Sequence, residues 1–480
     1  MNQSGPFDFS NVERKAQALA AQPYARGDNN LPAAFSALGY EQYREIRHRK
    51  EATLWREEKL PFQVQLFHRG FMFRERVDIN QIDQGAAQRL PYTPELFDFG
   101  TLTLPAATDM GFAGFKLLFP LARDENFQEI VVFLGGSHFR AAGLEQSLGL
   151  SARGLAVDAG LAKMEELPAF REFWLEKPAA DADQLIVYAL LDGPSLSGAY
   201  RLAIRAGLEL SIAVTAHLYF RNTVERLGIA PLNSMFDHGE NTSRPVNDYR
   251  PEVHDSDGLL LASGENDWQW RPLDNPRKLR IGHFPADNPV GFGLMKRDRN
   301  FDHYQDLEAR YHRRPSVWVE RQGEWGPGKL TLIEIPRNKD PIDNIVAFWT
   351  PENRTGAGKD FSLQYRLHFT MEDPPAPPLG RVAATRVDTG GKAGARRFMI
   401  DFQGGALPHL SPAARIEGEV SATFGRPENA RVQKNLETGG WRLSFELTPE
   451  KSAPRPVELR ARLKTGHDVL TETWLYPSEE

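Results

Sequence analysis

The chain has 480 residues, which is more than one hydrophobic core usually supports, so two domains are expected. Hydrophobic residues make up 41% of it and charged residues 25%, a balance that excludes a largely disordered protein. Its 64 acidic and 58 basic residues are mixed along the chain, which argues against a nucleic-acid partner. No apolar run approaches the ~20 residues that a membrane helix needs, so no membrane insertion is expected.

Cysteine is absent from the sequence, which excludes disulfides, thiolate metal sites and cysteine nucleophiles. The first six residues, Met-Asn-Gln-Ser-Gly-Pro, have neither the charged nor the apolar stretch of a signal peptide. The protein is therefore either cytoplasmic or one whose signal peptide has been removed, and composition does not decide between the two.

Few segments have the residue spacing of a helix, and most of them lie near the start of the chain. Ser10 and Glu13 have the spacing of a capping box, with Ser10 as the cap of a first helix. Asn30 stands before Pro32 as the candidate cap of a second helix. Helices are predicted over residues 15–21, 33–38, 41–49 and 160–173.

Elsewhere the apolar residues follow a period of two. Between residues 208 and 221 they occupy alternate positions, from Leu208 and Leu210 to Phe220, with mostly polar residues between them. This alternation puts the apolar side chains on one face of a long strand. Further strands are predicted over residues 62–67, 130–134, 185–191, 316–320, 330–335 and 344–349. Turn-rich stretches separate them, with 40 Gly and 34 Pro in the chain, which favours an all-β antiparallel sandwich.

The clearest boundary follows residue 372, where four prolines stand in five positions. Such a run is typical of a stiff extended linker and does not form the interior of a sheet. We predict a large N-terminal β-sandwich over residues 1–372, a linker over 373–380 and a C-terminal domain over 381–480. Strands in the last part are predicted over residues 398–402, 413–422, 440–447, 457–463 and 469–476. Their length and spacing fit a small immunoglobulin-like sandwich.

The usual catalytic signatures are missing, including the phosphate loop, the Gly-x-Ser-x-Gly elbow and the dinucleotide fingerprint. Polar clusters in otherwise structured regions are more informative. They lie at residues 236–241, 250–258, 296–304, 310–315 and 340–344. Cleavage of a glycosidic bond needs a protonated carboxyl and a second group that activates water, and Asp and Glu supply both without a metal.

Each cluster also has a purely structural interpretation. Asp255 and Asp257 could cap a turn, and Asp343 could be a loop residue bonded to backbone. The pair Arg313 and Arg314 is typical of solvated or salt-bridged side chains. The Asp and His residues could bind calcium or zinc, but their spacing matches no standard loop, and we expect neither a metal nor a cofactor. The residues alone therefore indicate a large β-sandwich suited to carbohydrate chemistry.

Segments in these clusters resemble the periplasmic glucan biosynthesis proteins OpgG and OpgD, also called MdoG and MdoD. They include Glu-Val-His-Asp-Ser-Asp-Gly at residues 252–258, Tyr-His-Arg-Arg-Pro-Ser at 311–316 and Asp-Asn-Ile-Val-Ala-Phe-Trp at 343–349. Residues 38–49, 60–73, 133–154, 233–241 and 291–316 resemble the family too, in the same order. The resemblance covers roughly residues 7–372 and implies a galactose-mutarotase-like sandwich followed by an immunoglobulin-like domain. It also implies export to the periplasm of a Gram-negative bacterium, with the signal peptide removed.

The resemblance further implies an enzyme that acts on β-1,2-glucan with inversion. Such an enzyme is either an endo-β-1,2-glucanase or a transglycosylase that forms a new α-linkage and could close a ring. The family pattern implies Asp343 as the general acid and Asp255 as the general base, with Asp257 as the fallback for the base. It places Tyr311 near the same site, as a proton relay or positioning residue. The substrate-binding candidates are Asp257, His254, Arg313, Asp302 and Trp349.

The chain departs from the family pattern at residues 339–342, where Pro341 and Ile342 replace more polar residues. These positions flank the expected acid, so the departure could favour transfer over hydrolysis. The alternative from another class is a non-catalytic glucan-binding or scaffold protein of the osmoregulated periplasmic glucan synthesis machinery. A mutarotase or epimerase is disfavoured because the resemblance points to a polymer. The expected partner is β-1,2-glucan polysaccharide, and a homodimer stays open.

Overall fold

Strands make up most of the structure, so the prediction of an all-β fold is confirmed. The computed structural model describes residues 5–105, 109–120, 126–337, 342–352, 356–375, 377–388, 394–448, 450 and 454–479. The chain forms two compact units: unit 1 contains Met1–Asn233, Val319–Thr331 and Phe348–Thr370, and unit 2 contains Ser234–Trp318, Leu332–Ala347 and Met371–Glu480. Over the described ranges, no helix has both the length and the apolar character needed to span a membrane.

Unit 1 contains parts of two sheets, with the strand order β2-β6-β7-β8-β9-β15 in one and β25-β14-β13-β12-β11-β3-β4 in the other. Its strands are β1 Arg47–His48, β2 Gln63–Phe67, β3 Asp78–Asp83, β4 Ala86–Arg89, β5 Phe97–Asp98, β6 Gly114–Pro120, β7 Phe127–Leu134, β8 His138–Ala141, β9 Ser151–Arg153, β10 Ala156–Val157, β11 Ala169–Glu176, β12 Gln184–Asp192, β13 Leu196–Arg205, β14 Leu210–Phe220, β15 Leu227–Ser234 and β25 Asp360–Thr370. The ring of Phe173 on β11 lies 5.0 Å from that of Phe115 on β6 and 5.2 Å from that of Phe133 on β7. This aromatic layer joins the two sheets into a sandwich.

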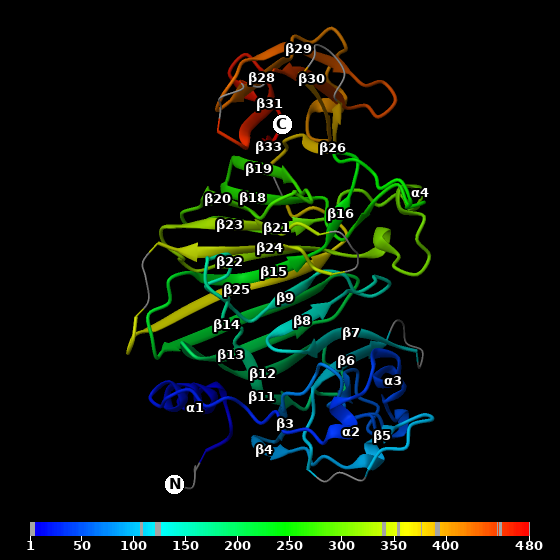
Figure 1. Ribbon diagram of the computed structural model, residues 1–480, viewed down its shortest axis with the longest axis vertical. Helices are drawn as coiled ribbons and strands as arrows, with labels where there is room; N and C mark the ends of the chain where they lie inside the picture. Colours follow the sequence, from blue (N-terminus) through cyan, green and yellow to red (C-terminus); the bar gives the residue numbers. More distant parts are fainter. Residues whose placement is uncertain are drawn as a thin grey trace. The chain divides into compact units, whose positions relative to one another are not determined.

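Three short helices complete unit 1: α1 Phe9–Ala20, α2 Ala33–Ser36 and α3 Tyr40–Glu45. The cap of α1 is Asp8, whose carboxylate accepts the backbone N–H of Ser10, so the prediction of Ser10 as the cap was wrong by two positions. Val12 and Ala16 pack with Trp174 of β11 in one buried cluster. Figure 1 shows α1 beside this sheet.

The second predicted cap, Asn30, is also wrong. The residue at the N-cap of α2 is Pro32, and it makes no side-chain hydrogen bond there. The helix predicted over 41–49 ends earlier, at Glu45, and the chain continues as strand β1.

The helix predicted over residues 160–173 is wrong, because strand β11 begins at Ala169. The pairing of β11 with β12 shifts between Phe170 and Glu172, which leaves one extra residue as a bulge. Phe170 and Phe173 therefore face the same core, with ring centres 5.3 Å apart, although they are three residues apart in sequence. That spacing imitates one face of a helix.

Unit 2 contains part of a sheet with the strand order β28-β31-β33-β19-β18-β21, the four-stranded sheet β26-β27-β30-β29 and the antiparallel pair β16-β17. Its elements are β16 Phe236–His238, β17 Val253–His254, β18 Gly258–Gly264, β19 Asp267–Pro272, β20 Arg280–Pro285, β21 Gly291–Met295, α4 Phe301–Tyr304, β26 Arg381–Asp388, β27 Arg396–Gln403, β28 Glu417–Ala422, β29 Pro427–Lys434, β30 Trp441–Leu447, β31 Val457–Thr465, β32 Asp468–Val469 and β33 Thr473–Ser478. Strands β22 Ser316–Gln322, β23 Gly328–Glu334 and β24 Ile345–Pro351 have residues in both units, and Ser234, the last residue of β15, belongs to unit 2.

The C-terminal strands share a core with strands that lie far earlier in the sequence. Strand β33 pairs in parallel with β19, where Trp474 stands opposite Trp270, and Figure 1 draws the two side by side. Both tryptophans belong to one buried cluster with Met295 and Phe398. The last part of the chain is therefore packed as part of unit 2.

The predicted division into residues 1–372, 373–380 and 381–480 stays a prediction, as do the galactose-mutarotase-like and immunoglobulin-like descriptions. The compact unit that holds the last segment also holds Ser234–Trp318. Within the predicted linker, Ala376 lies outside the described residues.

Candidate active site

Residues 234–236 bring together the two aspartates that were expected to be catalytic. The carbonyl of Ser234 accepts the backbone N–H of Asn344 at 3.0 Å, and the carbonyl of Met235 accepts that of Asp255 at 2.8 Å. Consecutive carbonyls of an extended segment point to opposite sides, so the segments of Asp255 and Asn344 flank it. Because neighbouring strands lie ~4.8 Å apart, the two flanking backbones are on the order of 10 Å apart.

Asn344 fixes the position of its neighbour Asp343. Its carboxamide accepts the N–H of Phe236 at 2.8 Å and donates to the carbonyl of Phe236 at 2.9 Å. Asn344 is buried, whereas Asp343 is half-buried just before strand β24. Pro341, one of the two departures from the family pattern, lies outside the described residues, while Ile342 is 58% exposed. The proposed acid therefore stands at the end of a well-anchored strand.

Asp255 is buried and held in an ion pair. Its carboxylate accepts a hydrogen bond from the guanidinium group of Arg314. The guanidinium carbon lies 4.5 Å from the centre of the Tyr311 ring, a cation–π contact. Tyr311, which is itself buried, thus supports Arg314, and Arg314 orients Asp255.

Asp257 has a different environment, although it is only two residues away. Its Oδ2 accepts the backbone N–H groups of Arg297 and Asp298, each at 2.6 Å. Its Oδ1 lies 3.2 Å from Nδ1 of His254 and 3.9 Å from Nζ of Lys296. Burial disfavours the charged carboxylate, but the His254 contact and the Lys296 charge outweigh it and hold the pKa of Asp257 below its usual range. The structure therefore uses Asp257 as an anchor for the backbone.

His254 and Lys296 form the positive part of this buried cluster. Nε2 of His254 lies 2.7 Å from Oε2 of Glu252. Burial and Lys296 oppose the imidazolium, but Asp257 and Glu252 outweigh them and raise the pKa of His254. Lys296 donates to the carbonyl of His254 at 3.1 Å, and burial lowers the pKa of Lys296 to about 8 against the pull of Asp257 and Asp255. The cluster holds the backbone that carries Asp255.

The other substrate-binding candidates lie elsewhere. Arg313 is exposed, and it is the adjacent Arg314 that contacts Asp255. Asp302 is exposed in α4. Trp349 belongs to unit 1, where it is 1% exposed and its ring centre lies 5.0 Å from that of Trp325. These positions show a core role for Trp349, and the substrate contacts of all three residues stay predictions.

Three residues of the site were missed by the sequence reasoning. Arg314 was grouped with Arg313 as a solvated or salt-bridged pair, so the pairing was foreseen but not the partner. Glu252 and Lys296 stand at the start of polar clusters, and nothing in their spacing indicates that they meet at His254.

One group among the described residues has the geometry to hold a metal ion. Glu252, Asp298 and His303 offer ligand atoms that all lie within 4.8 Å of one another. Nδ1 of His303 is already hydrogen-bonded to Asp298. Burial opposes the charged ring, but Asp298 outweighs it and raises the pKa of His303. A metal needs the neutral ring, so this arrangement favours an ion pair.

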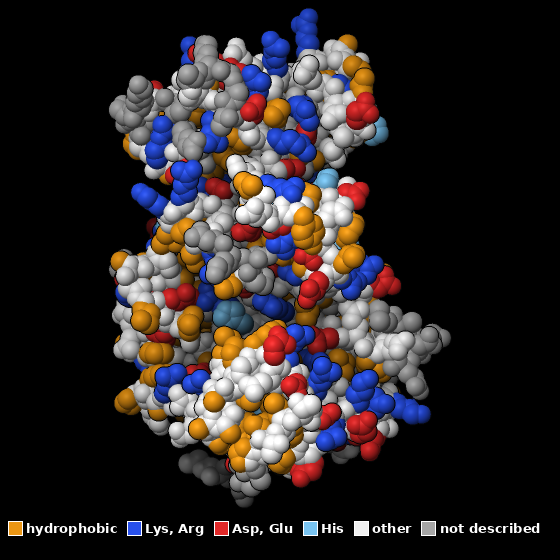
Figure 2. Space-filling model, turned by 45° about the vertical axis from the view of Figure 1, so that its right-hand side comes forward, with side chains coloured by type: hydrophobic (Ala, Val, Ile, Leu, Met, Phe, Trp, Pro, Cys, Tyr) orange, Lys and Arg blue, Asp and Glu red, His pale blue; other side chains and the backbone are white. Residues whose placement is uncertain are grey.

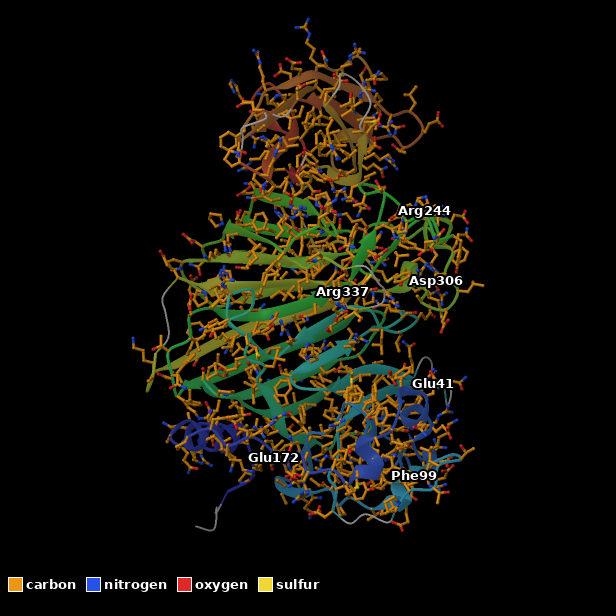
Figure 3. All side chains as sticks on the ribbon, in the orientation of Figure 1. Glu41, Phe99, Glu172, Arg244, Asp306 and Arg337 are labelled. Atoms are coloured by element: carbon orange, nitrogen blue, oxygen red, sulfur yellow. The ribbon has the colours of Figure 1, made fainter. Side chains whose placement is uncertain are left out.

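An open groove of about 1270 Å³ lies in unit 2, and Asp255 and Asp343 are not among the residues that line it. Asp237, which follows Phe236 in the chain, and Arg337 both line it. Asn275 accepts the N–H of Arg337 at 2.9 Å and donates to its carbonyl at 2.8 Å. Figure 3 labels Arg337, and Figure 2 shows acidic and basic side chains interspersed over the face that it draws. The groove is thus lined by the residue that follows Phe236 and by Arg337.

Comparison with known proteins shows the family of the chain. The family model described as "Periplasmic glucan biosynthesis protein, MdoG" matches residues 7–478. Glucans biosynthesis protein D of Stenotrophomonas maltophilia strain K279a is 43% identical over 99% of this chain and 90% of its own length. Glucans biosynthesis protein G of Rhodopseudomonas palustris strain BisA53 is 45% identical over 98% of this chain and 93% of its own length. Glucans biosynthesis protein G of Ralstonia nicotianae is 42% identical over 98% of this chain and 95% of its own length. The chain therefore belongs to the MdoG family of periplasmic glucan biosynthesis proteins.

Proposed function

We propose that the protein is a periplasmic enzyme that acts on β-1,2-glucan with inversion of the anomeric configuration. The observation that carries the proposal is the placement of the Asp255 and Asp343 segments on either side of residues 234–236. The residue that follows this stretch, Asp237, lines an open groove. Membership of a glucan biosynthesis family supports glucan as the substrate. The groove exceeds the ~300–1,000 Å³ of sites for small ligands, which supports a polymer rather than a single sugar.

In the proposed reaction, Asp343 gives its proton to the glycosidic oxygen as the bond from that oxygen to the anomeric carbon breaks. Asp255 takes the proton of the attacking hydroxyl as the new bond forms on the opposite face of the sugar. Inverting enzymes usually separate the two carboxyl groups by about 6.5–9.5 Å, and flanking backbones on the order of 10 Å apart are compatible with that room. Arg314 and Tyr311 act as positioning residues that orient the base.

The attacking hydroxyl belongs either to water or to another sugar. Water gives a shorter chain, and a sugar hydroxyl gives a new α-linkage, which closes a ring when it comes from the same chain. Ile342 beside Asp343 is apolar and exposed, where the family pattern has a more polar residue. The loss of a polar group that could hold water near the acid supports transfer over hydrolysis.

The experiment incubates the wild type and the variants Asp343→Asn and Asp255→Asn with linear β-1,2-glucan. We expect each variant to lose about 10²–10⁴-fold in rate, the usual contribution of a well-placed acid or base. Product sizes separate hydrolysis, which makes shorter chains, from transfer, which makes a new species without new reducing ends. Proton NMR early in the reaction should show the α-anomeric configuration, and a β-anomeric first product would refute inversion.

A non-catalytic glucan-binding protein is the second candidate, and one observation favours it. The carboxylate of Asp255 is 4% exposed and engaged by Arg314, which makes it less available as a base than an open carboxylate. A binding protein needs only the groove. Glucan that stays unchanged after long incubation but binds to the protein would support this function instead.

A further inference from the structure

We propose that the C-terminal segment of the chain forms one side of the saccharide groove and binds glucan away from the point of cleavage. This inference rests on the proposed function. Beside Asp237 and Arg337, the groove is lined by residues of the last hundred positions, among them Val387, Arg455, Tyr476 and Glu479. All of these residues belong to unit 2.

A buried ionic network fixes this side of the groove in place. The guanidinium group of Arg280 donates to Glu334 at 2.6 Å, to Asp274 at 3.0 Å and to Glu479 at 3.2 Å. Burial alone would lower the pKa of Arg280, but Glu334 and Asp274 outweigh it and raise that pKa. Arg280 and Glu334 are both buried, so the network keeps its geometry better than a surface pair would. Arg280 thus links Glu479 to Asp274, and both of these acidic residues line the groove.

The lining of the groove is linked to the proposed cleavage site through the backbone at Phe236. Its lining residue Asp237 directly follows Phe236, and Phe236 is hydrogen-bonded through its backbone to the carboxamide of Asn344. Arg337 is held by Asn275, which also lines the groove. A chain that is bound at the catalytic aspartates can therefore extend along the groove toward the C-terminal strands.

The chemistry of the lining suits a hydroxyl-rich chain. Asp248 forms an ion pair with Arg250, whose guanidinium Nη2 lies 2.7 Å from the Asp248 Oδ2. The hydrogen bond from Arg250 lowers the pKa of Asp248 to about 2. By contrast, the exposed cations Lys278 and Arg455 have no acidic partner among the residues that the structure describes. Lys278 follows the turn after β19, and Arg455 precedes β31, so they come from distant parts of the sequence. Both can donate hydrogen bonds to sugar hydroxyls.

The loop at residues 241–248 forms another side of the groove, with Ser243 and Pro245 in its lining. Arg244 lies between them in sequence and donates to the carbonyl of Asp248 at 2.8 Å, so the loop is closed on itself (Figure 3). With this loop on one side and the C-terminal strands on another, the groove offers contacts to more than one sugar residue.

The test measures the binding of linear β-1,2-glucan by calorimetry, with one short and one long chain-length fraction. The variants are Lys278→Ala, Arg455→Ala and the pair combined, each also in the Asp343→Asn background so that turnover does not interfere. We expect the double variant to lose about tenfold or more in affinity for long chains, since hydrogen bonds to charged groups are among the stronger ones. Affinity for short chains should be unchanged.

The control is Arg431→Ala, which removes an exposed arginine of strand β29 that does not line the groove, and it should change neither affinity. Thermal unfolding of Lys278→Ala, Arg455→Ala, the double variant and Arg431→Ala should match that of the background in which each is made, because these three side chains are exposed. Equal affinity of wild type and double variant for long chains would overturn the inference and leave the proposed function standing. Equal loss for short and long chains would overturn it too, because the residues would then act near the cleavage point. A wild type that binds no glucan would overturn both.

Discussion

The charge state of Glu240 should make the stability of unit 2 depend on pH. Glu240 accepts the backbone N–H of Thr385 at 2.6 Å and lies 3.5 Å from the guanidinium group of Arg386. Burial raises its pKa to about 7, Glu252 and Asp257 add to the effect, and Arg386 and the Thr385 N–H oppose it. The folded protein thus keeps a proton that the unfolded chain releases near pH 4.5.

The sign and size of the effect follow from this difference. Between pH 4.5 and 7 the folded state binds more protons than the unfolded state, so the free energy of unfolding falls as the pH rises. One pKa unit corresponds to about 1.4 kcal/mol, so the move from 4.5 to about 7 amounts to about 3 kcal/mol at pH 8. The variant Glu240→Gln keeps an oxygen for the Thr385 N–H but cannot ionise.

Urea unfolding at several pH values between 5 and 8 measures the effect. The free energy of unfolding of Glu240→Gln should exceed that of the wild type by an amount that rises with pH, by up to about 3 kcal/mol. The ion pair of Glu240 with Arg386 in the wild type reduces this difference. Glu324→Gln, which changes an 82% exposed glutamate, is the matched control and should give a flat difference. Parallel curves for Glu240→Gln and the wild type, or a difference that falls with pH, would refute the reasoning.

Three further substitutions follow from the site. Arg314→Gln should lower kcat about 10²-fold with little change in KM, because a misplaced base costs rate rather than binding; unchanged kcat in steady-state kinetics would contradict the role given to Arg314. Lys296→Met should lower the free energy of unfolding by about 3–5 kcal/mol, since it removes one of the two buried cations beside Asp257, and urea unfolding near neutral pH would show it. Trp349→Phe should cost about 1–3 kcal/mol in stability while glucan affinity stays that of the wild type; a large loss of affinity would instead support the prediction of Trp349 as a substrate contact.

The sequence was sufficient to predict features that depend on the residues of one strand or one loop. The alternation over 208–221 corresponds to β14, Leu210–Phe220, whose burial alternates along its whole length. The acidic segments at Asp255 and Asp343 were found as polar clusters and do flank one short stretch of backbone. Alternation and polar clusters can be recognised without knowing which other part of the chain packs against the element.

Sequence reasoning failed where a distant contact decides the outcome. The bulge in β11 gives Phe170 and Phe173 a helical spacing, and only the pairing with β12 reveals a strand. The partner of Asp255 is 59 positions away, at Arg314, and a charge pattern does not say which of two adjacent arginines turns inward. The pairing of β33 with β19 was not predicted either, because the two strands lie far apart in the sequence and neither segment indicates its partner.

That parallel pairing has a consequence for how the protein is made. Strand β19 receives its neighbour β33 only when Thr473–Ser478 are available, almost at the end of the chain. Until then the edge of β19 is an unpaired row of backbone groups, which is open to pairing with other chains. Contacts of such long sequence separation also form slowly. Unit 2 therefore depends on its last residues to close an aggregation-prone edge, and a chain that is cut short before them should be a hazard to the cell as well as inactive.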